Sequence, residues 1–175
     1  KYRHITGNQI FSVDHPWYLN GYISEEAKNL SSWIIPWIKK KFLHHSKYFE
    51  SNEKIFIDRS ESPNNHCQIE NNNEVIDFLS KKGFTSYKVG QLSFEQQIHL
   101  FKNAKVIVGA HGAAFANLAF CSPATQVIEI KPIDHPNYVI KTIGKINDLK
   151  VTIIETPKYE NHNINLDINE LNKNL

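Results

Sequence analysis

One histidine flanked by small residues is the feature of this sequence best suited to binding a ligand. An apolar run at positions 106–108 leads directly into Gly109, Ala110, His111, Gly112 and Ala113. Small side chains let a ligand approach the backbone, and the N–H groups at the start of a following helix attract anions. His111 adds a side-chain donor. The segment therefore predicts a pyrophosphate site at His111, Gly112 and Ala113. Gly109 and Ala110 would support it.

The same segment has an explanation that needs no ligand. Gly112 and Ala113 would then only allow a helix to pack closely on a sheet, and His111 would cap that helix. The residue types and their spacing leave both explanations open.

Two charged residues lie in or directly after other segments rich in β-formers. Arg59 follows the run at 54–58, and its guanidinium is suited to bidentate binding of a phosphate. The alternative for Arg59 is a surface salt bridge. Glu129 lies within the apolar run 127–130, where a carboxylate near a strand end can accept hydrogen bonds from ribose hydroxyls. Its alternative is a solvent-facing position on an edge strand.

Other catalytic and metal-binding patterns are absent from the sequence. His66-Cys67 and Asp134-His135 are pairs of potential ligands, but neither has a recognised metal-ligand spacing. We therefore expect no metal and no other cofactor. The sequence has no Gly-x-Ser-x-Gly elbow, no P-loop and no Gly-x-Gly-x-x-Gly turn. Their absence argues against a serine hydrolase, a P-loop enzyme and a dinucleotide-dependent dehydrogenase.

The elements that must position these residues alternate between strands and helices. Short runs rich in β-formers predict strands at 54–59, 85–89, 105–109, 126–130 and 151–155. Apolar residues at helical spacing, with a capping box at Ser93 and Gln96 and a stop at Gly83, predict the intervening helices. These helices are expected at about 24–41 with a kink or break at Pro36, and at 74–79, 94–104, 111–120, 138–147 and 168–175. The alternation predicts a Rossmann-like, doubly wound parallel sheet of the α/β class.

Length and composition favour one domain without a strong electrostatic partner. The 175 residues divide into an irregular lead-in at 1–22 and a single domain at 23–175. A net charge of +2 gives no indication of nucleic-acid binding, and no apolar stretch is long enough to cross a bilayer. Two widely spaced cysteines favour a reducing, cytoplasmic location. The start at Lys1 rather than Met favours a missing N-terminal part.

The order and spacing of several segments resemble glycosyltransferase family 61. The set comprises residues 54–59, 71–75, 92–98, 108–113 and 127–130, together with Asn117. The resemblance covers about residues 54 to 132. It implies a GT-B architecture, in which two Rossmann-like domains face each other and the C-terminal one holds the nucleotide-sugar. This chain is similar to that C-terminal domain.

Carried over position by position, the resemblance implies a donor site. Arg59 and the turn His111-Gly112-Ala113 would contact the pyrophosphate, with Asn117 supporting the turn from the next helix, and Glu129 would bind the ribose. The base would lie along the loop that contains Gln91, Leu92 and Ser93. Two departures stand out. Gln68 occupies the nearest match to an arginine of the family, and Ala114 or Ala124 stands where the family usually has glycine.

The resemblance implies an inverting transferase that moves a sugar from a nucleotide-sugar, a UDP-sugar in the first instance, to a glycan or other hydroxyl acceptor. A general base must then deprotonate the acceptor, and in a GT-B enzyme it often comes from a preceding N-terminal domain. Two alternatives stay open: a non-catalytic module that binds nucleotides or sugar phosphates, and a purely structural Rossmann-like domain.

Overall fold

The computed structural model of the chain describes residues 9, 30–62, 66–135, 139–157 and 163–175. The expected lead-in at 1–22 lies outside the described residues except for position 9. The expected helix start at Ser24 and most of the polar tail at 158–165 also fall outside them.

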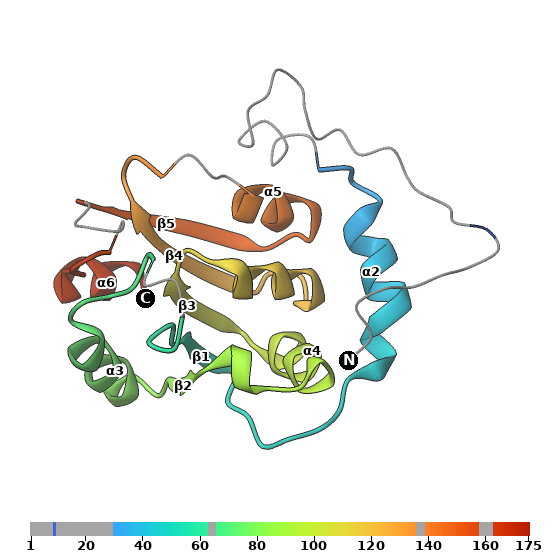
Figure 1. Cartoon of the computed structure of the whole chain (residues 1–175), viewed down its shortest axis with the longest axis horizontal. Coiled ribbons are helices and arrows are strands. Elements are labelled where there is room, and N and C mark those ends of the chain that lie inside the picture. The colour runs from blue at the N-terminus through green and yellow to red at the C-terminus, as the bar shows by residue number, and fades with distance from the viewer. Residues whose placement is uncertain (1–8, 10–29, 63–65, 136–138, 158–162) are drawn as a thin grey trace.

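Five parallel strands form the sheet (Figure 1). They are β1 (Lys54–Ile57), β2 (Thr85–Tyr87), β3 (Val106–Ala110), β4 (Gln126–Pro132) and β5 (Lys150–Thr156). Their order across the sheet is β2-β1-β3-β4-β5. All five were expected from the runs of β-formers, and each agrees with its predicted position to within two residues at either end. The predicted parallel α/β sheet is confirmed.

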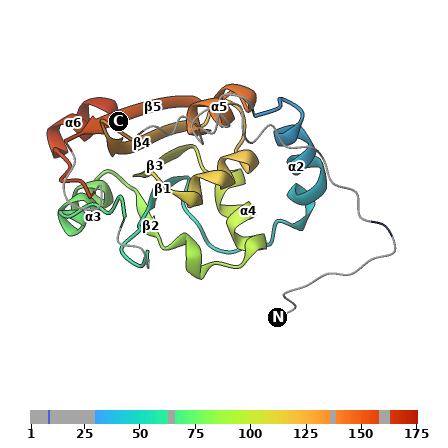
Figure 2. The same cartoon turned by 45° about the horizontal axis from the view of Figure 1, so that its top comes forward.

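Helices cover both faces of this sheet (Figures 1 and 2). The α-helices are α2 (Ile34–Phe42), α3 (Asn72–Lys81), α4 (Phe94–Asn103), α5 (Val139–Ile146) and α6 (Ile168–Asn174). The 3-10 helices are η1 (Leu43–His45), η2 (Val89–Gln91) and η3 (Ala113–Phe120). In both views α3 and α6 lie on one side of the sheet, and α2, α4, α5 and η3 lie on the other. This arrangement is Rossmann-like and doubly wound, as predicted. No helix in the described ranges is long and apolar enough to cross a membrane.

Local sequence signals explain where several helices begin and end. The capping box predicted at α4 is present: Ser93 Oγ accepts from the Gln96 N–H, and Gln96 Oε1 accepts from the Ser93 N–H. Gly83, which follows α3, has a φ of 83°, the left-handed conformation typical of a glycine stop. The helix expected at about 24–41 is not helical at residues 30–33 and begins only at Ile34. Pro36 does not break it, because it lies in the first turn, where a missing N–H leaves no hydrogen bond unmade.

The strands divide the hydrophobic core into two layers because alternate side chains point to opposite faces. Ile55, Ile57 and Val127 belong to the layer beneath α2, α4, η3 and α5. Phe56 and Ile128 belong to the layer beneath α3 and α6. The central strands are therefore buried on both faces, which explains their almost continuous apolar sequences.

The segment after β3 differs from the expected α-helix at 111–120. It is a 3-10 helix, η3, preceded by Gly112 as its N-cap residue. Three residues per turn bring Phe115 and Leu118 onto one line, and both are buried in the first core layer. The Phe115 N–H donates to the Gly112 carbonyl, so the N–H groups of Ala113 and Ala114 have no intrahelical acceptor. Fewer backbone N–H groups are therefore free at the start of this helix than at the start of an α-helix.

Ala124 provides a stability test of the turn before β4. It is exposed and has a φ of 64°, in the left-handed region that favours glycine. We expect Ala124→Gly to raise the free energy of unfolding by about 0.5–1 kcal/mol, because relief of backbone strain exceeds the added entropy of the unfolded chain. Chemical denaturation measures the change. Ala116→Gly, at an exposed position inside η3, is the control and should lower stability. A decrease in both variants would contradict the strain at Ala124.

Candidate functional site

The candidate site lies where the order of the strands reverses. From β1 the chain continues to β2 on one side, and then to β3 on the other side of β1. The carboxyl ends of β1 and β3 therefore border a crevice, which is where doubly wound proteins bind ligands. Ile57 in β1 pairs with Gly109 in β3. Arg59 and His111 each follow two residues later, so the sheet brings both predicted site residues to this edge.

Arg59 and Gly112 pack directly against each other. A Cβ atom built on Gly112 would collide with Nη1 of the Arg59 guanidinium, so only glycine leaves room for this arginine. Gly112 has a φ of 167° and a ψ of 174°, an extended backbone that any residue adopts. The glycine therefore provides space and not an unusual conformation. Gly109 also provides space, since an added Cβ there would lie 2.9 Å from Cβ of Ile57 in β1 and 3.4 Å from Cζ of Phe115 in η3.

The Arg59 guanidinium is half-buried and forms no ion pair with a carboxylate in the described part of the chain. Nη2 donates to the His66 carbonyl at 3.1 Å, and the buried Nε has no hydrogen-bond partner. Burial lowers the pKa of Arg59 and the Cys67 thiol opposes that shift, but a guanidinium stays charged in proteins. The described part of the chain thus gives no support to the salt-bridge alternative. The positive charge and its unused donor are suited to an anion.

His111 and Glu129 form a buried pair. Nδ1 of His111 lies 2.5 Å from Oε1 of Glu129, and the two residues are 9% and 0% exposed. The His111 side chain therefore contacts β4, and η3 has no side-chain cap. An ionised Glu129 can only accept, so Nδ1 donates to it and the orientation of the ring is fixed.

Glu129 does not lie where a ribose contact was expected. β4 runs between β3 and β5, so the residue is not on an edge strand, and its carboxylate is fully buried. Both expectations for Glu129, direct ribose contact and a solvent-facing edge, are therefore corrected. The register is the physical reason. Glu129 pairs with Gly109, two residues before His111, and this brings the carboxylate under the imidazole.

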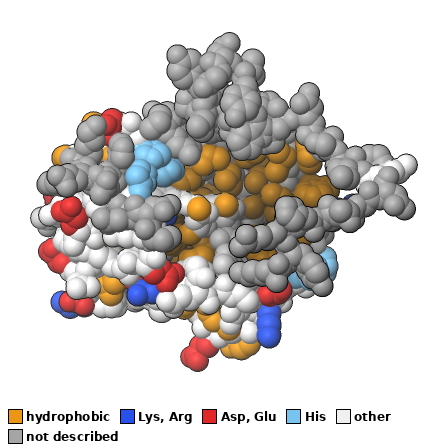
Figure 3. All heavy atoms as spheres, viewed as in Figure 1, with side chains coloured by type: hydrophobic (Ala, Val, Ile, Leu, Met, Phe, Trp, Pro, Cys, Tyr) orange, Lys and Arg blue, Asp and Glu red, His pale blue; other side chains and the backbone are white. Residues whose placement is uncertain are grey.

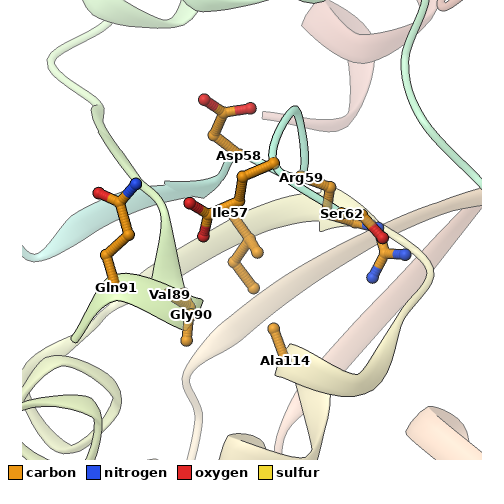
Figure 4. A pocket seen from close by; sticks show the side chains of 9 residues that line it. Ile57, Asp58, Arg59, Ser62, Val89, Gly90, Gln91 and Ala114 are labelled. Carbon is orange, nitrogen blue, oxygen red and sulfur yellow. The ribbon is translucent and has the colours of Figure 1, made fainter. Parts of the chain in front are cut away.

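A cavity of about 350 Å³ opens beside Arg59 (Figure 4). Its walls come from the end of β1 and the loop that follows, from η2, and from the start of η3. The lining residues are Ile57, Asp58, Arg59, Glu61, Ser62, Val89, Gly90, Gln91 and Ala114. Gln91, predicted to lie near the base, thus shares a cavity with Arg59. Leu92 instead packs against the core and Ser93 caps α4.

A second cavity lies on the other side of the turn after β3. It measures about 180 Å³, and His111, Gly112 and Ala113 line it together with apolar residues of η3 and α5. The turn therefore separates an apolar cavity from the more polar one beside Arg59. Within the turn, Ala110 is buried in the core and supports the backbone rather than lining either cavity.

The fold also assembles a possible metal site that the spacing of the sequence did not predict. His66, Cys67 and His135 place one ligand atom each within 4.8 Å of one another. They lie beside Arg59 and His111, since Arg59 binds the His66 carbonyl and the His111 and His135 ring centroids are 4.1 Å apart.

Comparison with known families identifies the chain. Residues 9–128 match the family model described as Glycosyltransferase 61, which is more than half of the 175 residues. The chain belongs to glycosyltransferase family 61. A comparison with curated proteins gave no match. The matched stretch contains Arg59, the turn at His111 and Asn117, and it ends just before Glu129.

Family membership and fold agree with each other. A parallel sheet covered by helices on both faces is consistent with a GT-B-like glycosyltransferase fold. The predicted family and fold class are thus confirmed, and the chain is a glycosyltransferase family 61 domain.

Gln97 is a site residue of this family 61 domain that the sequence did not single out. Its Nε2 donates to the carbonyls of Val89 and Leu92, both at 3.1 Å, and its Oε1 accepts from Nδ2 of Asn117 at 3.0 Å. Asn117 also donates to the Ala114 carbonyl at 3.1 Å. One chain of hydrogen bonds therefore joins η3 to the loop that lines the larger cavity. Its position within the segment 92–98 that resembles the family was the available signal.

Polar side chains also hold the loop that carries Arg59. Asp58 Oδ1 accepts from the Ser60 N–H at 2.9 Å and from Nδ2 of Asn72 at 3.0 Å. Gln68, which occupies the nearest match to a family arginine, donates to the carbonyls of Arg59 and Ser62 at 3.4 and 3.3 Å. Gln68 thus ties the loop together and does not add a positive charge to the site.

We expect Gln97→Glu to loosen the loop at 89–92. A carboxylate keeps the acceptor for Asn117 but cannot donate to the two carbonyls, so two hydrogen bonds are lost and repulsion replaces them. Hydrogen exchange of the Gln91 and Leu92 amides should accelerate, and the free energy of unfolding should fall by about 1–3 kcal/mol. Gln96→Glu is the matched control, because its acceptor for the Ser93 N–H is kept. Equal effects of the two variants would refute the role of Gln97.

The buried pair predicts that two substitutions rescue each other. His111→Ala leaves the Glu129 carboxylate buried without its partner, and we expect a loss of about 3–5 kcal/mol in the free energy of unfolding. Adding Glu129→Gln removes the buried charge, so the double variant should be more stable than His111→Ala alone. Denaturant melts of the parent, both single variants and the double variant measure the coupling. Additive losses would show that the pair is not coupled in solution.

Proposed function

We propose that this family 61 domain binds the nucleotide-sugar donor of an inverting glycosyltransferase, with a UDP-sugar as donor. The single observation that carries the proposal is the Arg59 guanidinium packed on Gly112 at the point where the strand order reverses. The diphosphate of the donor would contact Arg59, the His111 side chain and the N–H groups of Gly112 and Ala113, since the His111 N–H already donates to the Ile130 carbonyl at 2.8 Å. These groups are in place before the donor arrives, which is what stabilisation of a departing diphosphate requires.

The larger cavity is our candidate for the nucleoside. Its volume of about 350 Å³ lies within the range of small-molecule sites, and it begins at Arg59 and extends to Gln91. Because Glu129 is buried, we assign the ribose hydroxyls to Glu61, an exposed carboxylate that lines this cavity and faces Gly90. Gly90 leaves that space open, since a Cβ there would lie 3.1 Å from Glu61 Oε1.

His111 is proposed to act at the phosphates through its fixed orientation. Glu129 binds Nδ1, so the ring is held at the turn without loss of side-chain entropy when the donor binds. Glu129 is in this proposal a positioning residue. It contacts the histidine and not the nucleotide.

Transfer needs an acceptor and a base that deprotonates it. We propose that a preceding N-terminal domain supplies both the acceptor site and the base, and that the acceptor is a glycan or another hydroxyl compound. The transferred group would be a hexose or a pentose. No cofactor takes part in this proposal, because Arg59 and the turn supply the positive charge.

Titration of UDP and of UDP-sugars by calorimetry tests the proposal, followed by a transfer assay on the full-length protein. Binding of UDP together with turnover supports the enzyme. Binding without turnover would favour a non-catalytic nucleotide-binding module, and absence of any nucleotide binding would leave a structural domain.

The contact between Arg59 and Gly112 predicts a non-additive pair of substitutions. Arg59→Ala should weaken UDP binding by about 1.5–3 kcal/mol, the range for hydrogen bonds to charged groups. Gly112→Ala should weaken binding by displacing the guanidinium, yet it should leave the fold intact because the backbone is extended and the displaced group is the flexible end of a side chain. In the Arg59→Ala background, Gly112→Ala should therefore cost little further affinity.

Calorimetry on the parent and the three variants completes this cycle, with thermal unfolding as the control for folding. Ala124→Gly, in the turn before β4 and in the lining of neither cavity, should leave UDP affinity unchanged. If Gly112→Ala binds UDP as the parent does, the turn and Arg59 do not form the phosphate site.

A further inference from the structure

Two loops meet beside the candidate donor site and bring three metal-binding side chains together. His66 and Cys67 lie in the loop between β1 and α3, and His135 lies just after β4. One ligand atom from each residue lies within 4.8 Å of the other two, and Cys67 Sγ lies 4.0 Å from Nε2 of His66. Figure 3 shows histidine side chains gathered on one face of the molecule, next to an apolar area.

The ligand set has a definite chemical preference. One thiolate and two imidazoles are borderline-soft ligands, which suit Zn²⁺ and do not suit Mg²⁺, Ca²⁺ or Mn²⁺. In a tetrahedral zinc site, bonds of about 2.0–2.3 Å place neighbouring ligand atoms roughly 3.5 Å apart. The three atoms, now within 4.8 Å of one another, would therefore have to approach by up to about 1.3 Å, which rotations of half-buried histidine side chains provide.

The surrounding contacts hold the ligands in place. The His66 carbonyl accepts from Arg59 Nη2, and the His135 carbonyl accepts at 3.0 Å from Nζ of Lys131, a lysine that is fully buried. Cys67 is fully buried and has a φ of 53°, a conformation rare outside glycine and one that the surrounding structure must impose. Outer contacts of this kind orient the ligands of metal sites.

We infer that His66, Cys67 and His135 bind a zinc-type divalent ion that clips the loop after β1 to the loop after β4. The fourth coordination position is left to water. The ion holds the loop after β1, which carries Arg59, against the loop after β4. It stabilises the protein because it binds the folded chain and not the unfolded one. This site does not depend on the proposed binding of a nucleotide, because its three ligands are separate from the residues assigned to the donor.

Cobalt provides the direct test. Purified protein is stripped of metal with a chelator and titrated with Co²⁺, whose absorption spectrum distinguishes tetrahedral sites and adds a charge-transfer band when a thiolate binds. We expect one equivalent of Co²⁺ to give this band and Zn²⁺ to displace it. Elemental analysis of the untreated protein should find zinc in preference to copper, and Zn²⁺ should raise the temperature of unfolding.

Matched variants separate this site from adventitious binding. Cys67→Ser should abolish the charge-transfer band, and His135→Gln should weaken Zn²⁺ binding by at least roughly tenfold, the lower end of what loss of an outer-shell partner costs. Cys121→Ser removes the other buried free thiol, and His45→Gln breaks the His44–His45 pair, whose ring centroids are 4.0 Å apart. Both controls should bind as the parent does.

Three results would overturn the inference: no thiolate band in the parent, loss of Zn²⁺ binding in His45→Gln instead of His135→Gln, or uptake of copper without zinc. If Cys67→Ser fails to fold, His135→Gln and the parent spectrum still decide the question, because His135 is only partly buried.

Discussion

The contact between a half-buried arginine and a glycine determines the geometry of the site. The Arg59 guanidinium occupies the space that a side chain at position 112 would fill, so the guanidinium can hold this position against the turn after β3 only because residue 112 is glycine. The larger cavity is lined by Arg59, the smaller one by Gly112, and the buried His111–Glu129 pair adjoins the same turn. Among the described residues this charge has no carboxylate partner, and an unpaired buried charge weakens a fold.

Much of the fold could be predicted from the sequence because its signals are local. Apolar strands, the Ser93 cap and the Gly83 stop each depend on a few neighbouring residues, and the parallel sheet then brings Arg59 and His111 to one edge. The partner of His111 could not be predicted, because it depends on the register between β3 and β4. From the local sequence alone, Glu129 could equally lie at an accessible strand end. The 3-10 geometry of η3, which aligns the buried Phe115 and Leu118, was not predicted either, because the apolar pattern at 111–120 fits an α-helix as well.

The cluster of His66, Cys67 and His135 shows where prediction from spacing fails. Known metal motifs place ligands within a few residues of each other, on one turn or one helix face. Here the ligands come from two segments separated by β2, β3 and β4 in sequence, and only the meeting of the loops at the carboxyl edge brings them together. The same edge that makes a doubly wound sheet suitable for a nucleotide also brings ligands from distant loops together. Neither a nucleotide site nor a metal site at this edge therefore requires ligands that are close together in the sequence.

Strand β4 links the core to the site along one of its faces. Alternate residues point the same way, so Val127, Glu129 and Lys131 share a face of the sheet. Val127 packs in the core, Glu129 binds the His111 ring, and Lys131 donates to the His135 carbonyl. On the opposite face Ile128 and Ile130 stay apolar throughout. Within five residues, one face of this strand thus passes from hydrophobic packing to charged side chains that hold site residues in place. The other face packs in the core. Because both charged residues are fully buried on a central strand, they can fix the positions of the two loops with little freedom of their own.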